Sequence, residues 1–232
     1  MSFLFGKSVN GLAISGHRFG IQLNSRQTSY QKKKKHMLVL GGVHGDEVEG
    51  VVLANAILLK LLESDTLEFQ MTLVPAFNID GVLAKTRGNA NGVDLNRNLP
   101  TKDWSPEATT PRYQPGPSPL SEPENKALVG FIQSEMPDFI LSLHSWKPLL
   151  NINDPEGSEI CQQVAAAIAK HTGDIIEPTI GYSTPGCLGT YAGFEREIPT
   201  LTYEIERGLS PTVVIEKHLS ACFSGFQKFA SL

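Results

Sequence analysis

The sequence predicts an α/β protein in which a mixed, mostly parallel β-sheet carries helices on both faces. Apolar, β-branched runs with almost no polar interruption indicate strands that are buried on both faces. These runs alternate along the chain with longer segments of helical periodicity. At 232 residues the chain is long enough to bury a large core, so we expect residues 1–232 to form one catalytic domain.

The first third of the chain contains the central strand of this prediction, Leu38–Val43. Short β-prone pieces precede it, and we interpret residues 1–36 as a hairpin or edge strands, with the four lysines 32–35 in a solvated turn. Apolar residues at helical spacing then predict a helix over Glu47–Glu63. A further strand is predicted over Phe69–Val74.

The middle of the chain is irregular before regular elements return. Asn78–Gly81 is predicted to be a turn, and residues 85–120, rich in glycine, asparagine and proline, a long loop. Loops of that length are usually functional when they are ordered. Ser121 is predicted to cap a helix, because proline follows in the first turn and Glu124 stands at the third position. This helix should end near Met136, because the next residue is proline.

The last part of the chain alternates in the same way. The expected elements are, in order, a buried strand (Phe139–Leu143), a short strand (Leu149–Ile152), a helix (Gly157–His171), a loop (Gly181–Gly189), a strand (Thr200–Ile205) and a closing helix (Pro211–Leu232). The sequence shows no internal repeat and no linker between domains.

The composition argues against several classes of protein. A formal net charge of −4 disfavours nucleic acid or an anionic membrane as the main partner. The longest apolar stretch, Val51–Leu62, is interrupted by polar residues and is too short to span a membrane, and no signal peptide is expected. The three cysteines (Cys161, Cys187 and Cys222) have no metal-binding spacing and predict reduced thiols, so we expect a cytoplasmic protein.

Two of the predicted strands lead into histidines. His44 follows the first buried strand and precedes Glu47 by three residues, while His144 follows Phe139–Leu143. Because ligands bind beyond the carboxyl ends of the strands in such sheets, these side chains can converge there. Two histidines and a glutamate with an open fourth position are typical of catalytic zinc. A plainer interpretation also stands: Asp46 and Glu47 favour a helix N-terminus, and a strand-end histidine can be structural.

Five motifs, in order, resemble the zinc metallocarboxypeptidase family, over approximately residues 36–210. They are His44–Glu47, Lys85–Arg87, Gly92–Asn98, His144 and Thr202–Glu204. The resemblance implies the carboxypeptidase fold and a zinc-dependent hydrolase. Within the family, the chain looks most like the murein peptide amidases, which cleave the γ-D-glutamyl–diaminopimelate bond of bacterial cell-wall peptides and so serve cell-wall recycling. The segments that carry this likeness are 90–98, 116–124 and 181–186.

The resemblance assigns a metal site and a general base. Strand alternation alone puts Thr202, Glu204 and Glu206 on one face. The family match selects Glu204 as the base that takes a proton from water, and Glu206 can instead pair with Arg207. The implied ligands of one Zn²⁺ per chain are His44, Glu47 and His144.

The resemblance also assigns residues to the substrate, a small peptide with a free terminal carboxylate such as a murein tripeptide. Arg87 would stabilise charge on the scissile carbonyl oxygen. Asn96 and Arg97 would grip the terminal carboxylate, and Tyr182 would contact the substrate. Without the resemblance, Arg87 is a solvated loop arginine and residues 94–98 are a polar turn.

The amidase interpretation leaves part of the substrate without a partner. The far end of diaminopimelate carries an amine and a second carboxylate, and residues 186–197 are candidates from their position. The charged members of that segment are Glu195, Arg196 and Glu197. Residues 99–120 match nothing recognisable in the family, which bears on specificity more than on chemistry.

Three other functions remain open. Deacylases of the aspartoacylase and succinylglutamate desuccinylase type share the zinc motif, but they usually add a β-rich C-terminal domain, for which we expect no room after Glu204. The second is a carboxypeptidase acting on another terminal residue, and the third is a non-catalytic peptide-binding protein. Since we expect no propeptide, signal sequence or disulfide pair, an intracellular bacterial enzyme is favoured over a secreted digestive one.

Overall fold

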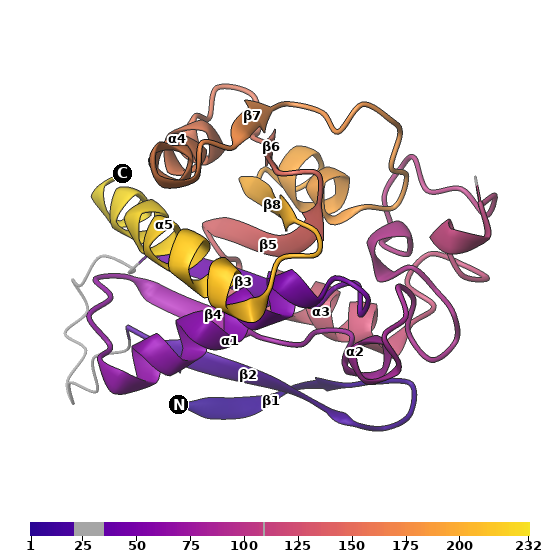
Figure 1. The fold of residues 1–232 in the computed structure, drawn as a ribbon. Coiled ribbons are helices and arrows are strands. Elements are labelled where there is room, and N and C mark those ends of the chain that lie inside the picture. Colours follow the sequence, from indigo (N-terminus) through magenta and orange to yellow (C-terminus); the bar gives the residue numbers. More distant parts are fainter. Residues whose placement is uncertain (21–34, 109) are drawn as a thin grey trace, which may run out of the picture.

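A mixed sheet of eight strands organises the part of the chain that the computed structural model describes, residues 1–20, 35–108 and 110–232. The strand order is β1-β2-β4-β3-β5-β8-β6-β7 (Figure 1). The strands are β1 (Ser2–Lys7), β2 (Ala13–Phe19), β3 (His36–Gly41), β4 (Gln70–Val74), β5 (Phe139–Trp146), β6 (Leu149–Asn153), β7 (Ile175–Glu177) and β8 (Thr200–Glu206). Pairs β3/β4, β3/β5, β5/β8 and β6/β7 are parallel, and β1/β2, β2/β4 and β6/β8 are antiparallel. The predicted fold class is confirmed.

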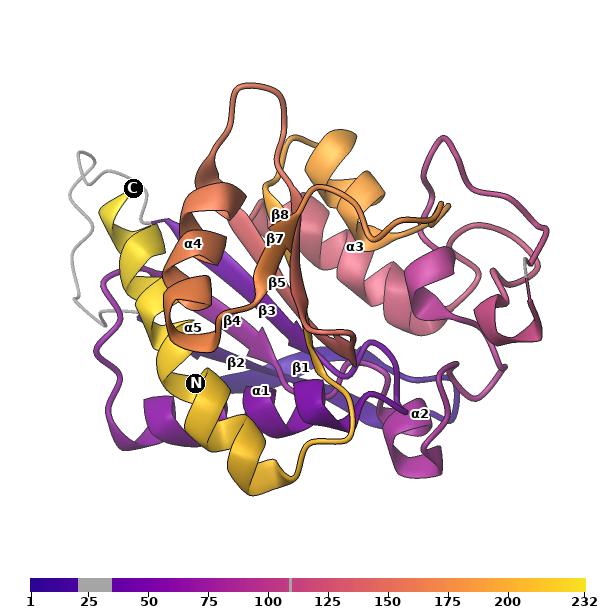
Figure 2. The ribbon, with the colours of Figure 1, turned by 45° about the horizontal axis from the view of Figure 1, so that its top comes forward.

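Helices cover both faces of this sheet. Figure 2 shows α1, α4 and α5 together on one face and α3 on the other. The helical elements are α1 (Val48–Glu63), α2 (Ile79–Ala84), η1 (Leu95–Arg97), η2 (Pro111–Tyr113), α3 (Pro123–Glu135), α4 (Ile160–Thr172), η3 (Gly189–Phe194) and α5 (Pro211–Ser231). Of the helices in the described residues, none has the length and apolar character needed to cross a membrane.

The core consists of two apolar layers, one on each face of the sheet, and β3 contributes to both. Met37 and Val39 pack in the layer with α1 and α5, while Leu38 and Leu40 pack in the layer with α3. Alternate residues of a strand point to opposite faces, so the stretch of a strand that lies between the two apolar layers is apolar at successive positions. Each such fully buried side chain stabilises the fold by about 1.5–3 kcal/mol. This explains the uninterrupted apolar run of the sequence.

The register of the parallel strands places the candidate functional side chains at the same height along neighbouring strands. Gly41 of β3 pairs with Leu143 of β5, and His144 pairs directly with Glu204 of β8. β5 is longer than predicted, because its pairing with β8 continues to Trp146, so His144 lies inside the strand rather than after it. The carboxyl edge of the sheet therefore carries an imidazole and a carboxylate side by side.

Two local predictions in the middle of the chain are wrong. Asn78–Gly81 is not a free turn: Asn78 is the N-cap of α2, and its side chain accepts a hydrogen bond from Gly81 N at 2.9 Å. Ser121 does not cap α3, whose N-cap is Glu122. The Ser121 hydroxyl instead donates to the Glu122 carboxylate at 2.6 Å and accepts from Asn98 Nδ2 at 3.0 Å. The end of α3 is as predicted, since Met136 adopts a left-handed conformation at φ 45°.

The N-terminal prediction is confirmed where the structure describes it. β1 and β2 form an antiparallel pair that extends the sheet through β4. The predicted lysine turn falls largely on residues 32–34, which lie outside the described residues, as does the whole segment 21–34. The three cysteines are free and buried.

Candidate active site

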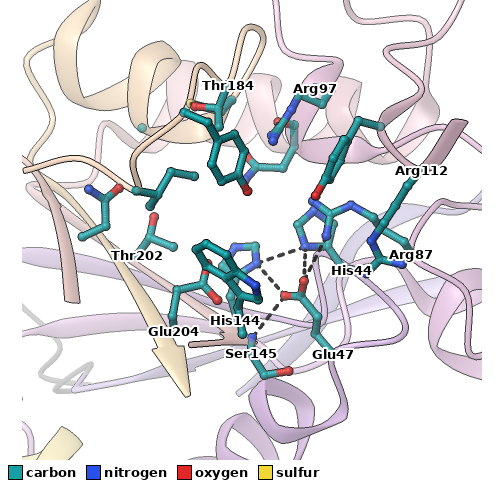
Figure 3. A pocket seen from close by; sticks show the side chains of 18 of the residues that line it. His44, Glu47, Arg87, Arg97, Arg112, His144, Ser145, Thr184, Thr202 and Glu204 are labelled. Atoms are coloured by element: carbon teal, nitrogen blue, oxygen red, sulfur yellow. Dashed lines mark hydrogen bonds and ion pairs between the residues drawn. The ribbon is translucent and has the colours of Figure 1, made fainter. Parts of the chain in front are cut away.

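A pocket opens at the carboxyl edge of the sheet, beyond the ends of β3, β5 and β8 (Figure 3). Its lining includes every residue to which the sequence assigned a role: His44, Glu47, Arg87, Asn96, Arg97, His144, Tyr182 and Glu204. These residues are separated by up to 160 positions in the sequence, and the parallel strand order brings them together.

The backbone after β3 places the first two of these side chains. Gly42 turns the chain at φ 65°, a conformation that costs glycine little. Gly45 passes against α2 so closely that a Cβ there would lie 1.9 Å from the Gly81 carbonyl carbon. Glu47 then serves as the N-cap residue of α1. The plain helix-start interpretation of this stretch and the metal interpretation are therefore compatible, because the helix N-terminus is what aims the carboxylate.

The two histidines and Glu47 form a compact cluster in which both imidazoles present Nδ1 to the same point. His44 Nδ1 lies 2.9 Å from Glu47 Oε1, His144 Nδ1 lies 2.9 Å from Glu47 Oε2, and the two Nδ1 atoms are 3.2 Å apart. All three side chains are buried. Among the described residues, these three are the group whose ligand atoms lie close enough together to hold a metal ion.

The cluster fits zinc. Ligand atoms about 2.0–2.1 Å from a tetrahedral Zn²⁺ lie about 3.3 Å from one another. The observed separations of 2.9 to 3.2 Å are within a few tenths of an ångström of that value. Two nitrogen donors and one carboxylate, with a fourth side open to the pocket, are the donor set of a catalytic rather than a structural zinc site.

Each imidazole is oriented by a partner on its far nitrogen. His44 Nε2 lies 3.0 Å from Asp94 Oδ1, and His144 Nε2 lies 2.9 Å from the Ser142 hydroxyl. Such partners fix the tautomer and the ring plane of a metal-binding histidine. The sequence reasoning assigned no role to either partner, although Asp94 lies inside the matched motif Gly92–Asn98 and was detectable there.

Arginines surround the Glu47 carboxylate. Arg87 Nη1 donates to Glu47 Oε1 at 3.0 Å, and its Nε donates to Asp94 Oδ2 at 2.8 Å. Arg207 Nη2 lies 3.3 Å from the same Glu47 oxygen. Burial raises the pKa of Glu47, but the charges and hydrogen bonds of His44 and His144 outweigh burial, and the pKa lies well below its usual range. Glu47 is thus an anion, as a ligand must be.

His44 and Asp94 form a coupled buried pair. Burial and Arg87 lower the pKa of His44, yet the carboxylates of Glu47 and Asp94 outweigh them and raise it. Burial likewise raises the pKa of Asp94, while the His44 charge and hydrogen bond and then Arg87 bring it below its usual value. We conclude that Asp94 stays ionised and favours a proton on His44 Nε2, which leaves Nδ1 free for a ligand.

Glu204 faces this cluster from β8. Burial raises its pKa to about 7, because the effect of desolvation and of the Glu47 charge exceeds that of His144 and the nearby arginines. Its Oε2 atom is buried and has no hydrogen-bond partner among the described residues. A buried carboxylate oxygen aimed into a pocket without a partner is costly unless a ligand satisfies it. Glu206, the other candidate on this face, is exposed.

Asn96 and Arg97 also line the pocket. The Asn96 oxygen accepts a hydrogen bond from Leu188 N at 2.8 Å. The Arg97 guanidinium donates to the Asn96 carbonyl at 2.6 Å and lies over the Tyr113 ring at 5.2 Å. Within the described chain no carboxylate lies at ion-pair distance from Arg97, whereas other arginines of the pocket are paired. Arg97 is only 6 % exposed, and its charge helps to lower the pKa of the buried Asp94 carboxyl, although the two groups form no ion pair.

The long loop supplies one side of the pocket. Arg112 pairs with Asp46 at 2.6 Å, which joins the loop to the turn that carries His44. Tyr113 lies over both Arg87 and Arg97. Tyr182, on the opposite loop, is 44 % exposed and packs edge-on against Trp146 at 6.0 Å. Residues 85–120, for which the sequence suggested a functional loop, therefore contribute Arg87, Arg112 and Tyr113 to the lining of the pocket.

Two sequence interpretations do not match the contacts. Of the candidate segment 186–197, Cys187 and Gly189 line this pocket but the charged residues 195–197 do not; Arg196 instead lies over the Tyr191 ring. Arg207 does not pair with Glu206 in the described structure. It contacts the Ser145 carbonyl at 3.1 Å and the carboxylates of Asp46 and Glu47. Arg207 is therefore directed towards the turn that carries Asp46 and Glu47.

Comparison with known proteins places the chain in a family. The model of the zinc carboxypeptidase family matches residues 2–192. A murein peptide amidase A from Vibrio campbellii is 32% identical over 228 residues, covering 94% of this chain and 84% of the relative. The enzyme of the same name from Escherichia coli K12 is 35% identical over 165 residues, covering 66% of this chain and 64% of the relative. The crystal structure of a murein-tripeptide amidase from Escherichia coli O157 has the same fold, with a TM-score of 0.77, 24% identity, and coverage of 97% of this chain and 91% of that one.

The donor set at the carboxyl edge of the sheet defines the class as metal-dependent hydrolases. The family match, which extends over most of the chain, makes the assignment specific. The chain belongs to the zinc carboxypeptidase family and is a zinc hydrolase. The resemblance found in the sequence is confirmed. The family match ends before Glu204, so the evidence for that residue is its position in the sheet.

Proposed function

We propose that the chain hydrolyses the γ-D-glutamyl–diaminopimelate bond of murein peptides. The observation that carries the proposal is the pocket itself, which is lined by a potential metal-binding cluster, by a carboxylate oxygen without a partner and by a buried arginine that forms no ion pair among the described residues. The 32% identity to a murein peptide amidase over 94% of the chain supports the choice of substrate. We further propose that residues 1–232 act as one catalytic domain, on murein peptides inside a bacterial cell.

In this proposal His44, Glu47 and His144 would hold one Zn²⁺ per chain. When bound, the ion supplies Lewis-acid polarisation of the scissile carbonyl and lowers the pKa of water at its open position. Glu204 Oε2 takes a proton from the attacking water and later passes it to the leaving amine. A pKa raised to about 7 suits both transfers, because a general base works best when its pKa is near the operating pH.

Arg97 and Asn96 would bind the carboxylate that remains free on the residue after the cleaved bond. Guanidinium matches a planar carboxylate through two parallel hydrogen bonds. Such a ligand would give the buried guanidinium of Arg97 an ion pair, which it lacks among the described residues. Because the Asn96 oxygen is already committed to Leu188 N, its NH₂ group is the donor that remains for the substrate.

Arg87 would stabilise the charge that develops on the carbonyl oxygen. Its Nε and Nη1 atoms are held by Asp94 and Glu47, so the guanidinium is fixed before the substrate arrives. A donor that needs no reorganisation during the reaction is the kind that lowers a barrier most. Tyr182, at the exposed rim of the pocket, would contact the peptide chain.

The experiment that tests this proposal measures release of free diaminopimelate from L-Ala-γ-D-Glu-meso-diaminopimelate by the zinc-loaded chain. N-acetylaspartate and N-succinylglutamate are offered in parallel as deacylase substrates. We expect release from the tripeptide and none from the acyl-amino acids. Hydrolysis of the acyl-amino acids instead would overturn the proposal in favour of a deacylase, and inactivity towards all three with zinc bound would favour a binding protein.

A further inference from the structure

One buried asparagine of α3 has no part in the proposed chemistry, yet it contacts the segment that carries Asn96 and Arg97. This residue, Asn125, is only 1 % exposed. Its Nδ2 donates to the Leu95 carbonyl at 2.9 Å and to Asn98 Oδ1 at 3.3 Å. These two acceptors lie on either side of Asn96 and Arg97 in the chain. The side chain of Asn125 therefore holds both ends of η1, the short helix to which the pair belongs.

The orientation of the Asn125 amide is fixed by its partners. The Leu95 oxygen is a backbone carbonyl, which can only accept, so Asn125 must turn its NH₂ group towards it. The Asn98 amide is fixed in the same way, because its Nδ2 donates to the carbonyls of Pro115 and Ser118 at 2.7 and 3.0 Å. Asn98 Oδ1 is therefore an acceptor, and it also accepts from the N-cap amide of α3 at 3.3 Å. Both hydrogen bonds of Asn125 thus run from α3 to η1.

The other end of the same amide has no partner. Asn125 Oδ1 is buried and forms no hydrogen bond among the described residues. A buried acceptor without a partner lowers the stability of the fold, whereas leucine has nearly the same size and no polar atom to satisfy. Departures of this kind from the local rules of stability are expected at functional sites. The side chain is costly to the fold at one end and bound to η1 at the other.

The position of η1 determines where the Arg97 guanidinium lies. Figure 3 shows the Arg97 side chain at the wall of the pocket that it lines. Among the described residues Arg97 forms no ion pair, and its guanidinium instead donates to the carbonyl of Asn96, within the same short helix, at 2.6 Å. A displacement of η1 therefore displaces the guanidinium as well. A binding group must be held within about 0.5 Å of its productive position, so a small displacement is enough to weaken binding.

We propose that Asn125 is a positioning residue for the carboxylate-binding pair Asn96 and Arg97. By donating to both ends of η1, Asn125 holds the Arg97 guanidinium where it can form two parallel hydrogen bonds with a carboxylate. Asn125 is not among the described residues that line the pocket, so it acts only through η1. This inference rests on the proposed function, which assigns the free carboxylate of the murein peptide to Asn96 and Arg97.

The test uses Asn125→Leu, which keeps the size of the side chain and removes its donor. The variant takes this donor from the Leu95 carbonyl but also removes the unpartnered oxygen, so its two effects on stability oppose each other. With L-Ala-γ-D-Glu-meso-diaminopimelate we expect KM to rise at least about fivefold, as loss of one hydrogen bond predicts, while kcat changes less than about twofold. Bound zinc should be unchanged. Gln133→Leu, at an exposed position of the same helix, is the matched control and changes none of these quantities.

A second variant and a double-mutant cycle separate positioning from a general loss of structure. Asn125→Asp keeps the shape of the side chain but places an acceptor against two acceptors, and it should raise KM at least as much. If Asn125 acts through Arg97, Asn125→Leu should raise KM by less than about twofold once Arg97 has been replaced by glutamine. Multiplicative effects of the two changes on KM would overturn the inference, and so would an unaltered KM in both Asn125 variants.

A crystal structure of the zinc-loaded Asn125→Leu variant, or of Asn125→Asp if the first does not fold, tests the inference without a substrate. We expect the Arg97 guanidinium to move by more than about 0.5 Å, and an unmoved guanidinium would overturn the inference. If the unaltered chain cleaves the tripeptide and the Asn125 variants have its KM, the inference is wrong and the proposed function stands. If the unaltered chain does not cleave the tripeptide, the proposed function is wrong, and the position of Arg97 in the crystal decides the inference.

Discussion

Replacing Asp94 with asparagine tests how the site is held together. Asp94 is fully buried and contacts three groups: His44 Nε2 at 3.0 Å, Arg87 Nε at 2.8 Å and Asn96 N at 2.9 Å. Asparagine keeps the shape, but its NH₂ group must face one of these donors. Losing such a partner of a metal-bound histidine typically lowers metal affinity by about 10–100-fold. A buried donor left unpaired costs a further 1–3 kcal/mol of stability, roughly.

The pH dependence of this effect has a definite sign. The pKa of Asp94 is lower in the folded protein than in the unfolded chain. Its charge therefore contributes stability above the unfolded-state pKa of roughly 4, and that contribution is lost as the pH falls further. The free energy of unfolding of Asp94→Asn should lie well below that of the unaltered protein at pH 7, and the gap should narrow as the pH falls below about 4.

The assay has two parts. Zinc affinity is measured by competition with a chelator at pH 7, and stability by urea unfolding of the zinc-free protein between pH 3.5 and pH 7. Asp138→Asn serves as the control, because that carboxylate is exposed and accepts one backbone hydrogen bond from His36 N at 2.7 Å. The reasoning is refuted if Asp94→Asn binds zinc as tightly as the unaltered protein, or if the stability gap does not change with pH.

Three further predictions concern the pocket. Arg97→Gln should raise KM for the tripeptide at least about tenfold while zinc affinity is unchanged, because it removes a bidentate carboxylate partner. Steady-state kinetics measure KM and metal analysis measures the bound zinc; an unaltered KM would contradict the prediction. The acid limb of the kcat/KM profile should have its midpoint below about pH 7. Burial raises the pKa of Glu204 to about 7, and the charge of bound Zn²⁺ then lowers this pKa by favouring the carboxylate. A pH–rate profile with a midpoint above about pH 7 would contradict this prediction. Arg112→Gln should change the free energy of unfolding by less than about 1 kcal/mol, because the Arg112 side chain is 43 % exposed and only its pair with Asp46 is lost. Thermal unfolding measures this change, and a larger loss would assign the loop a structural role.

The sequence predicted best where burial leaves few choices. β3, α1, β5 and β8 follow from apolar patterns, because a strand between two apolar layers or a helix on one of them admits only such residues. The metal cluster followed from the same elements, since His44 and His144 come directly from the ends of predicted strands. Their convergence required parallel strands, which the alternation of strands and helices predicts. It also required that β3 and β5 be neighbours, which the alternation does not predict.

The sequence predicted poorly where several polar partners compete. Ser121 has the sequence signature of a helix cap, yet it bonds the neighbouring Glu122 carboxylate. Arg207 contacts Ser145 and the Asp46–Glu47 turn rather than Glu206. Such choices depend on distances of a few ångströms between segments far apart in the chain, and local patterns do not contain them.

Local sequence patterns also could not decide between Glu204 and Glu206 as the general base. Alternation puts both on one strand face, and the sequence chose Glu204 only through its resemblance to the family. In the structure the two differ by depth: Glu204 sits beside His144 in the pocket, while Glu206 is exposed at the end of β8. Depth along a strand depends on where the neighbouring strands end, and the periodicity of one strand cannot reveal it.

The measurement that bears most directly on the account is the zinc content and the turnover of Glu204→Gln, determined on one preparation. The account predicts one zinc ion per chain, as in the unaltered protein, together with a fall in kcat of about 10²–10⁴-fold. A variant that retains full turnover would remove Glu204 from the chemistry. A variant that loses its zinc would make Glu204 part of the metal site and contradict the division between ligands and base.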